Sequence, residues 1–371
     1  MKCTDRNTRV KNNGCQASPA ILMLNNRCQA SPAILMLNNR CQASPAILML
    51  KKLSCILFLL IPFCTVGCSQ AGYSMPYTAD SEVSSFRVVN LEQERGTAIP
   101  FASELCVVNS NTGSSDVDMS NAEGAGLFDI NGRNTIYAKN AHEKLYPASL
   151  TKVMTTLVAL KHSSGDLMLT ATANVRNLEA GAQVCGIKEG DQMTLDQALH
   201  LLLINSANDA AVMIAEGVAG SVEAFADMMN QEALALGATN THFVNPHGLP
   251  DEDHYTTVYD MYLIMNAAIN YSAFTEIIQM DSYTTVYTDK NGASREVSVS
   301  STNRYMQGTA EIPGGITIIG GKTGTTNAAG HCLILLSRDA ASNPYISVIM
   351  RADGGDFLYS QMTDLLEEIN K

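Results

Sequence analysis

The chain has 371 residues, of which 46% are hydrophobic and 16% are charged, and its formal net charge is −12. This composition excludes a largely disordered chain, and the length fits one large folded domain or two small ones. Residues 1–52 hold eight Lys and Arg and a single acid, so the remainder carries 16 bases against 35 acids. Such an acidic body lacks the basic footprint of a nucleic-acid-binding protein and disfavours adhesion to anionic lipid.

A perfect 13-residue repeat occupies the N-terminal region. The sequence CQASPAILMLNNR fills 15–27 and again 28–40, and a third copy runs over 41–50 before it diverges. This period is too short for a solenoid unit, and so few copies cannot build a core. We therefore interpret residues 1–48 as a repetitive extension outside the folded protein, and we hypothesise that translation starts at Met49.

Residues 49–71 are typical of a targeting signal. Two lysines precede an apolar stretch over 53–66, and residues 69–71 have the small-x-small form of a signal peptidase site. Residues 65–68 resemble a lipobox, in which Cys68 would be lipidated. An uncleaved anchor helix is the third alternative, although the apolar stretch is short for a membrane span. All three place the following residues outside the cytoplasm, secreted or attached to the outer face of the cytoplasmic membrane through the N-terminus.

The polar segment 72–100 is predicted to be a linker, and the pattern becomes that of a folded domain over 101–371. Alternating residues around Asn131-Gly132 predict a β-hairpin with a two-residue turn. Apolar spacing predicts helices over 149–162, 194–204, 207–218, 222–236 and 357–369, and strands over 316–321, 332–337 and 345–350. Strands near both ends with helices between them predict an α+β domain.

The cysteines are concentrated in the N-terminal region. Seven of the ten lie within the first 68 residues, and only Cys106, Cys185 and Cys332 follow. They make neither a disulfide framework nor a Cys-x-x-Cys zinc motif, so we interpret them as buried thiols. The sequence predicts no metal and no cofactor.

Ser149 and Lys152 are the first pair that suggests chemistry. Positions three apart share one face of a helix, and a residue in the first turn lies near free backbone N–H groups and the positive end of the helix dipole. A serine hydroxyl needs a base to act as a nucleophile, and a desolvated lysine can supply one near neutral pH. The pair therefore suggests nucleophilic catalysis, although an exposed helix face often has the same spacing.

A second element, Ser206 and Asn208, lies in the turn between two predicted helices. A serine there can pass a proton, and an asparagine amide can bind both a substrate carbonyl and a lysine. The segment Ser301-Thr302-Asn303 has the same Ser-x-Asn form in an irregular polar stretch. We interpret Ser301 and Asn303 as structural.

The third element comprises Lys322, Thr323, Gly324 and Thr325, at the end of a glycine-rich predicted strand. Glycine lets another backbone approach closely. A lysine and a hydroxyl at a strand edge can hold a carboxylate, while the edge backbone groups pair with an extended peptide. Alone, Lys-Thr-Gly also fits an exposed basic turn.

The three elements together match the Ser-x-x-Lys, Ser-x-Asn and Lys-Thr-Gly signature of β-lactamases and penicillin-binding proteins. Over residues 124–338 the sequence resembles the serine-type D-Ala-D-Ala carboxypeptidases, which are low-molecular-mass penicillin-binding proteins. The segments that carry the resemblance are 146–155, 205–211, 243–250, His254-Tyr255 and 322–330. The resemblance implies a β-lactamase/transpeptidase-like α+β fold with a mainly antiparallel sheet flanked by helices.

The resemblance also implies a reaction and its catalytic residues. Ser149 would attack the carbonyl between the two terminal D-alanines of a peptidoglycan stem pentapeptide and release D-alanine. Lys152 would be the base, and Ser206 and Asn208 would relay protons and position the substrate. β-Lactam antibiotics would acylate the same serine, and the activity would belong to cell-wall biogenesis and cell shape.

The substrate-binding residues implied by the resemblance lie in the third element. Lys322 and Thr323 would bind the terminal carboxylate, with Gly324 and Thr325 completing the substrate-binding strand. The backbone N–H groups of Ser149 and Thr325 would form an oxyanion hole.

Two histidines lie in the segments that carry the resemblance. With Lys152 available as base, we interpret His247 and His254 as structural.

Three other functions are left open as alternatives. A serine β-lactamase shares acylation but needs a glutamate for fast deacylation, and no convincing glutamate motif lies between Asn208 and Lys322. A D,D-endopeptidase or transpeptidase could use the same residues, and a non-catalytic module that binds penicillin or peptidoglycan is the third alternative.

Overall fold

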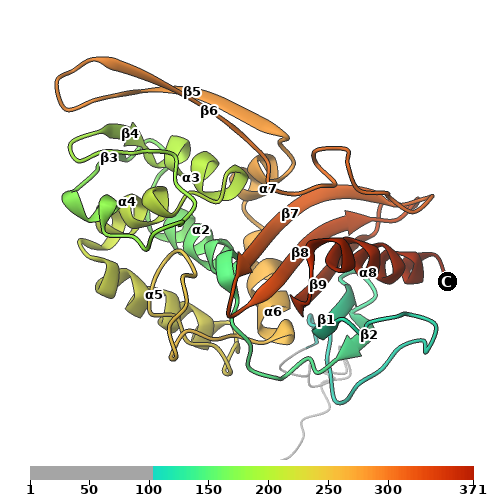
Figure 1. Ribbon diagram of the computed structural model, residues 1–371. Coiled ribbons are helices and arrows are strands. Elements are labelled where there is room, and N and C mark those ends of the chain that lie inside the picture. The colour runs from blue at the N-terminus through green and yellow to red at the C-terminus, as the bar shows by residue number, and fades with distance from the viewer. Residues whose placement is uncertain (1–102) are drawn as a thin grey trace, which may run out of the picture. The chain divides into compact units, whose positions relative to one another are not determined.

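The computed structural model describes residues 103–371. The predicted extension, signal and linker lie outside the described residues. The described chain is built around a five-stranded antiparallel sheet with the strand order β2-β1-β9-β8-β7 (Figure 1). Its strands are β1 Ala122–Asp129, β2 Asn134–Lys139, β7 Thr317–Thr326, β8 Gly330–Arg338 and β9 Pro344–Ala352. Because β1 pairs with β9, the two ends of the described chain share one sheet.

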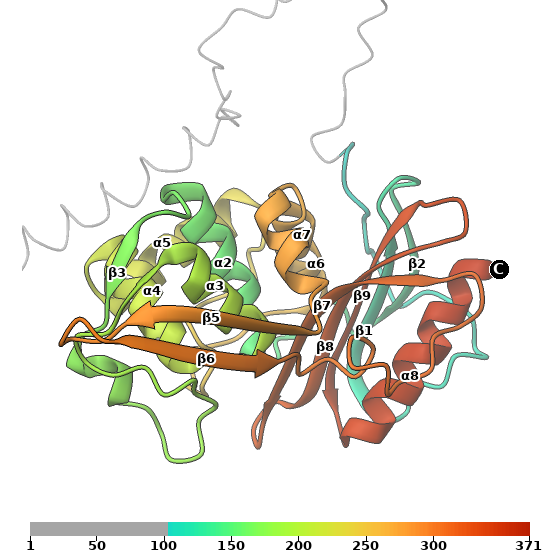
Figure 2. The same ribbon diagram turned by 90° about the horizontal axis from the view of Figure 1, so that it is seen from above.

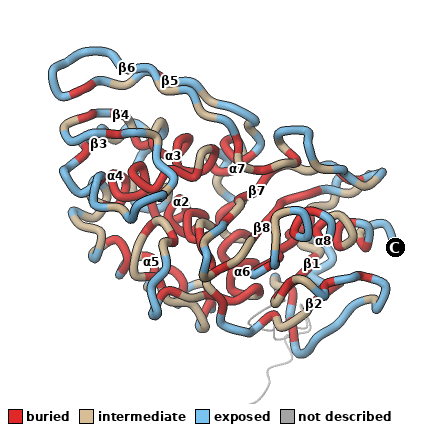
Figure 3. Tube along the Cα trace, in the orientation of Figure 1, coloured by how far each residue is buried: buried red, intermediate tan, exposed pale blue. Residues whose placement is uncertain are grey.

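Helices cover both faces of this sheet. The described helices are α2 Thr151–His162, α3 Leu195–Ile204, α4 Asn208–Ala219, α5 Val222–Ala235, α6 Val258–Ala268, α7 Ser272–Ile278 and α8 Gly355–Glu367. Of these, α6 and α7 contact one face of the sheet and α8 the other, whereas α3, α4 and α5 pack on other helices. Alternate residues of β8 face two separate cores, with Ile334 toward α2 and α6, and Leu333 and Leu335 toward α8. Figure 3 shows the buried helices of the first core beside this sheet. Each face of the sheet buries apolar side chains against the helices on that side, and this burial holds the layers together.

A second, four-stranded antiparallel sheet borders the helical part, in the order β3-β4-β5-β6. Its strands are β3 Met168–Thr170, β4 Gln192–Thr194, β5 Ser282–Thr288 and β6 Ser294–Ser300. The sequence analysis did not predict these strands, because exposed Ser and Thr separate the few apolar residues of the two long ones, such as Val297 and Val299. Figure 2 shows the β5–β6 hairpin lying along the helices and leading toward β7.

The predicted helices are confirmed, with ends that follow ordinary capping rules. Thr194 and Gln197 form the reciprocal capping box at the start of α3. Gly237 follows α5 in the left-handed region, with φ of 80°. Both signals are local in sequence, which is why the sequence could reveal them.

Two strand predictions need correction. The β1–β2 connection is a four-residue loop, because Asp129 pairs with Asn134. Within it Gly132 donates its N–H to the Asp129 side chain at 2.8 Å, and Arg133, with φ of 53°, takes the left-handed position. Strand β7 does not end at residue 321 but continues to Thr326, paired with β8 throughout its second half.

Candidate active site

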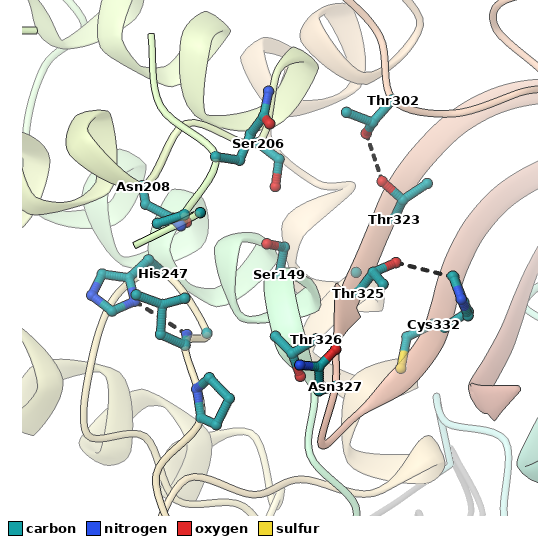
Figure 4. A pocket seen from close by; sticks show the side chains of 18 of the residues that line it. Ser149, Ser206, Asn208, His247, Thr302, Thr323, Thr325, Thr326, Asn327 and Cys332 are labelled. Atoms are coloured by element: carbon teal, nitrogen blue, oxygen red, sulfur yellow. Dashed lines mark hydrogen bonds between the residues drawn. The ribbon is translucent and has the colours of Figure 1, made fainter. Parts of the chain in front are cut away.

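A cleft of about 620 Å³ lies between the helical part of the described chain and strand β7 (Figure 4). Its walls come from segments far apart in sequence: the turn before α2, the turn between α3 and α4, β7, and loops around residues 179–183 and 247–250. Side chains from all three sequence elements line it: Ser149, Ser206, Asn208, Thr323 and Thr325.

Ser149 lies in a short 3-10 turn that leads directly into α2. The preceding Ala148 has φ of 47°, a left-handed conformation that is unfavourable for a non-glycine residue. A Cβ atom on Gly324 would lie 3.0 Å from the Ser149 backbone nitrogen, and one on Gly248 would lie 1.8 Å from the Ala148 carbonyl oxygen. Glycine at both positions therefore allows β7 and the 245–250 loop to close onto the Ser149 turn.

Lys152, the second residue of α2, is fully buried one turn after Ser149, and its amino group has three acceptors. Its Nζ lies 2.9 Å from Ser149 Oγ, 2.6 Å from Asn208 Oδ1 and 2.6 Å from the His247 carbonyl oxygen. Each of the three N–H groups of a protonated Lys152 thus has an acceptor, which offsets part of the cost of burying the charge.

Burial, by contrast, opposes the charged form of Lys152 and favours a neutral amine beside the Ser149 hydroxyl. Burial lowers the pKa of Lys152 well below its usual range, the positive charge of Lys322 adds to this, and Asp209 opposes it. A neutral amine has two hydrogens and one lone pair, and the two carbonyl oxygens can only accept hydrogens. The lone pair is therefore left for Ser149 Oγ, which then donates its proton to Lys152.

Ser206 and Asn208 occupy the turn that the sequence predicted between two helices. Ser206 has φ of 62° and points its hydroxyl toward the space beside Ser149 (Figure 4). Asn208 is the first residue of α4, and its backbone N–H donates to the Gln183 carbonyl at 2.8 Å. Because Asn208 Oδ1 accepts from Lys152, its Nδ2 remains to donate to a bound carbonyl oxygen.

Strand β7 presents hydroxyl groups, rather than an ammonium, at the cleft surface. Thr323 and Thr325 lie two residues apart and line the cleft, whereas Lys322 is 1% exposed and donates to the Thr323 carbonyl at 2.8 Å. Burial lowers the pKa of Lys322 to about 7. The strand thus offers hydroxyl donors to a ligand carboxylate, with a buried cation behind them.

The two histidines support the backbone around the site. His254 Nδ1 accepts the N–H of Val244 at 3.1 Å, so its Nε2 carries the hydrogen and donates to Thr151 Oγ1 at 2.8 Å. Thr151 in turn donates to the carbonyl of the strained Ala148 at 2.8 Å. Burial lowers the pKa of His254 to about 4, so the ring is neutral at neutral pH.

His247 is also neutral. Burial lowers its pKa to about 3. Its Nδ1 accepts the N–H of Leu249 at 3.2 Å, within the loop that closes onto the Ser149 turn. Both rings thus make the local contacts expected of structural residues.

Asp209 is a supporting residue that the sequence reasoning missed. Its buried carboxylate accepts backbone N–H groups of Cys185, Gly186 and Ile187 at 2.9–3.1 Å. Burial raises its pKa, and these hydrogen bonds oppose the rise. Asp209 thereby fastens the loop whose residues 179–183 form one wall of the cleft. Its position next to Asn208 was the available signal, but its partners are distant in sequence.

Arg304 lies at another edge of the cleft and was also not predicted. Its Nη1 donates to Asp356 Oδ1 at 2.7 Å, and its guanidinium lies 4.9 Å from the Tyr359 ring centre. These contacts cross more than 50 residues of sequence, so no local pattern reveals them. Over residues 103–371, no cluster of His, Cys, Asp and Glu is arranged to hold a metal ion, and no helix there is long and apolar enough to span a bilayer.

Comparison with known proteins gives consistent matches. The family model for D-alanyl-D-alanine carboxypeptidase matches residues 110–354. The chain is 32% identical over 253 residues to D-alanyl-D-alanine carboxypeptidase DacF of Bacillus subtilis, covering 66% of this chain and 61% of the relative. It is 32% identical over 249 residues to DacC of Escherichia coli, covering 65% of this chain and 59% of that protein. The chain therefore spans about three fifths of the length of these curated relatives.

Solved structures agree with this fold. A crystal structure of a Streptomyces DD-transpeptidase is similar with a TM-score of 0.62 and 25% identity. The match covers 67% of this chain and 96% of the transpeptidase. The α+β architecture expected from the sequence, a mainly antiparallel sheet flanked by helices, is confirmed.

Proposed function

This chain belongs to the D-alanyl-D-alanine carboxypeptidase family, and on that premise we propose that it removes the terminal D-alanine from peptidoglycan pentapeptide stems. The observation that carries the proposal is the position of Lys152 Nζ, 2.9 Å from Ser149 Oγ and fixed by two carbonyl acceptors. This arrangement suits an activated serine nucleophile.

In the proposed acylation, Ser149 Oγ attacks the carbonyl carbon of the penultimate D-alanine. Lys152 takes the hydroxyl proton, and a new C–O ester bond forms. As the C–N bond breaks, Ser206 relays a proton to the departing amine, and free D-alanine leaves. Water then attacks the ester with Lys152 again as base, which releases the shortened peptide and restores Ser149.

Substrate orientation is assigned to strand β7. The Ser149 backbone nitrogen faces β7, as its closeness to a Cβ on Gly324 indicates, so the N–H groups of Ser149 and Thr325 would donate to the oxyanion. Thr323 would receive the terminal carboxylate, with Lys322 supplying positive charge from behind. Asn208 Nδ2 would hold a carbonyl of the stem peptide.

β-Lactam antibiotics would acylate Ser149 through the same steps and act as inhibitors. We place the activity outside the cytoplasm, with any membrane attachment through the N-terminal region. The similarity to a DD-transpeptidase favours one second candidate, transfer of the acyl group to an amine rather than to water. The two differ only in the acceptor that resolves the acyl-enzyme.

Intact mass after incubation with benzylpenicillin tests the nucleophile. The wild-type protein is expected to gain one stable penicilloyl adduct, and Ser149→Ala is expected to gain none. Ser164→Ala, at an exposed serine just after α2, is the matched control and should acylate normally. Absence of an adduct on the wild type would overturn the mechanism, and rapid loss of the adduct with hydrolysed drug would indicate a β-lactamase.

Release of D-alanine from a pentapeptide tests the reaction itself. The wild type should release it, and Ser149→Ala should not. If an added amine captures the acyl group and suppresses hydrolysis, the protein is a transpeptidase. If Ser149 is acylated by penicillin but no peptide is turned over, the protein is a binding module.

A further inference from the structure

Thr302 lies across the cleft from Ser149, between Ser301 and Asn303, the two residues that we interpret as structural. Its side chain lines the cleft, and its Oγ1 lies 2.5 Å from Thr323 Oγ1 (Figure 4). The flanking Ser301 and Asn303 are 7% and 2% exposed and turn away from the solvent. Of this segment, only the central residue therefore contacts the ligand-binding strand from the cleft.

The backbone around Thr302 is held by a hydrogen bond to the end of α3 and by hydrogen bonds within residues 301–305. Its N–H donates to the carbonyl of Ile204, the last residue of α3 and two residues before Ser206, at 3.2 Å. Ser301 Oγ accepts the N–H of Asn303 at 3.2 Å, and Asn303 Oδ1 accepts the N–H of Tyr305 at 3.1 Å. The hydroxyl of Thr302 is thus held at one position relative to both the Ser206 turn and β7.

The direction of the Thr302–Thr323 hydrogen bond depends on what occupies the cleft. Each hydroxyl has one hydrogen, so with no ligand either side chain can donate to the other. A carboxylate can only accept, so Thr323 must give its hydrogen to a bound carboxylate. Thr302 then becomes the donor to Thr323 Oγ1, and the two bonds in series strengthen each other.

We propose that Thr302 is a positioning residue that aims the Thr323 hydroxyl at the terminal carboxylate of the substrate. The inference rests on the proposed function, in which Thr323 receives that carboxylate. Thr302 acts through Thr323 and does not take part in bond making or breaking. Its effect is therefore largest for ligands with a free carboxylate, because a charged acceptor makes the stronger hydrogen bond, and it appears in binding rather than in the chemical step.

The test compares Thr302→Val, which keeps the shape and removes the hydroxyl, with Thr302→Ser, which keeps the hydroxyl. Each is assayed on a D-Ala-D-Ala peptide with a free carboxylate and on the same peptide with a terminal amide. For Thr302→Val we expect KM for the free acid to rise about fivefold, the value of one ordinary hydrogen bond, with kcat within about twofold. The amide, whose neutral carbonyl oxygen is the weaker acceptor, should be affected less, and Thr302→Ser should resemble the wild type.

Thr317→Val is the matched control, because Thr317 is exposed on β7, the strand that carries Thr323, and does not line the cleft. Thermal melting of each variant shows whether it is folded. Equal effects on acid and amide, or no effect on either, would overturn the role assigned to Thr302. So would a kcat loss that Thr302→Ser does not rescue.

Acylation by benzylpenicillin and by its methyl ester separates this inference from the proposed function. If the wild type turns over neither peptide, the carboxypeptidase assignment fails, and the comparison continues on this pair by intact mass. Thr302→Val should slow acylation by the free acid about fivefold and slow acylation by the ester less. Identical slowing of both would overturn the inference even where the peptidase activity is intact.

Discussion

Gly248→Ala tests how strictly the Ser149 turn depends on the loop packed against it. Gly248 has φ of 88°, and a Cβ atom there would lie 1.8 Å from the Ala148 carbonyl oxygen and 2.9 Å from Thr151 Oγ1. Because Cβ contacts below 3.0 Å essentially never occur, the loop and the turn must separate by at least 1.2 Å, the difference between the two distances. Misplacement of a reacting group by about 1 Å can lower its rate about 100-fold.

The expected result is loss of both stability and acylation. The left-handed backbone costs an alanine about 1–2 kcal/mol, and separating the loop from the turn adds to that. Gly292→Ala isolates the first contribution, because Gly292 has φ of 80° and no atom within 4 Å of its Cβ position. Gly292→Ala should therefore be destabilised about 1–2 kcal/mol in urea unfolding and acylate at the wild-type rate.

The measurements are urea unfolding and the rate of benzylpenicillin acylation by intact mass. Gly248→Ala should lose more stability than Gly292→Ala and acylate about 100-fold more slowly while still folded. A folded Gly248→Ala that acylates at the wild-type rate would refute the reasoning, because it would mean that the Ser149 turn tolerates displacement.

Three further predictions concern the charged groups around the cleft. The rate of acylation by benzylpenicillin should rise with pH as Lys152 loses its proton, and it should fall above about pH 7 as Lys322 loses its charge. The rate for the methyl ester, which has no free carboxylate, should not fall above about pH 7. An identical pH profile for both compounds would contradict the role of Lys322. Burial lowers the pKa of His254 to about 4 in the native state, against the ordinary value of about 6.5 in the unfolded chain, so the unfolded chain binds more protons between these values. Stability to urea should therefore decline as pH falls from 6.5 to 4, by about 3 kcal/mol for this group, and the decline should shrink in His254→Gln. Asp209→Ala should release the loop at 179–187 and raise KM more than it lowers kcat, whereas Glu223→Ala, at an exposed acid in the first turn of α5, should change neither.

The sequence could predict what depends on neighbours along the chain. The pair Ser149 and Lys152 needs only helical spacing to come together, and Thr194 with Gln197 needs only a helix start. Asn208 could be placed at a helix start, but its contact with Lys152 crosses 56 residues and follows from the fold alone. The family resemblance, rather than local pattern, supplied that proximity.

Other features could not be predicted because their signals are tertiary. The sequence predicts that strand β7 ends at its glycines, at residue 321. In the structure, pairing with β8 extends the strand to Thr326, so Thr323 and Thr325 lie within it. Thr302 had no signal of its own, because its significance arises only from contact with Thr323. Asp209 was visible as an acid in a helical first turn, but its three backbone partners lie 22–24 residues away in an irregular loop.

The strained residues of the cleft suggest how the site is kept rigid before a ligand arrives. Ala148 and Ser206 both have positive φ; Ala148 precedes Ser149, and Ser206 carries the second serine hydroxyl on the helical side of the cleft. A non-glycine residue keeps such a conformation only where its surroundings over-determine it. At Ala148, His254 donates a hydrogen bond to Thr151, and Thr151 donates one to the Ala148 carbonyl oxygen. Gly248, which has no side chain, packs directly against that carbonyl.

This arrangement predicts that residues outside the reacting groups affect acylation through the stability of the Ser149 turn. The groups that keep Ala148 strained contact neither Lys152 Nζ nor the hydroxyl of Ser149, so weakening them should first lower stability and the rate of acylation together. Thr151→Val removes the hydroxyl bonded to Ala148 while keeping the shape of the side chain. It should lose about 1–3 kcal/mol of stability, as expected for a buried hydrogen bond with an orphaned partner. If it acylates normally despite that loss, the strain at Ala148 is maintained by the close packing of Gly248 and β7 alone.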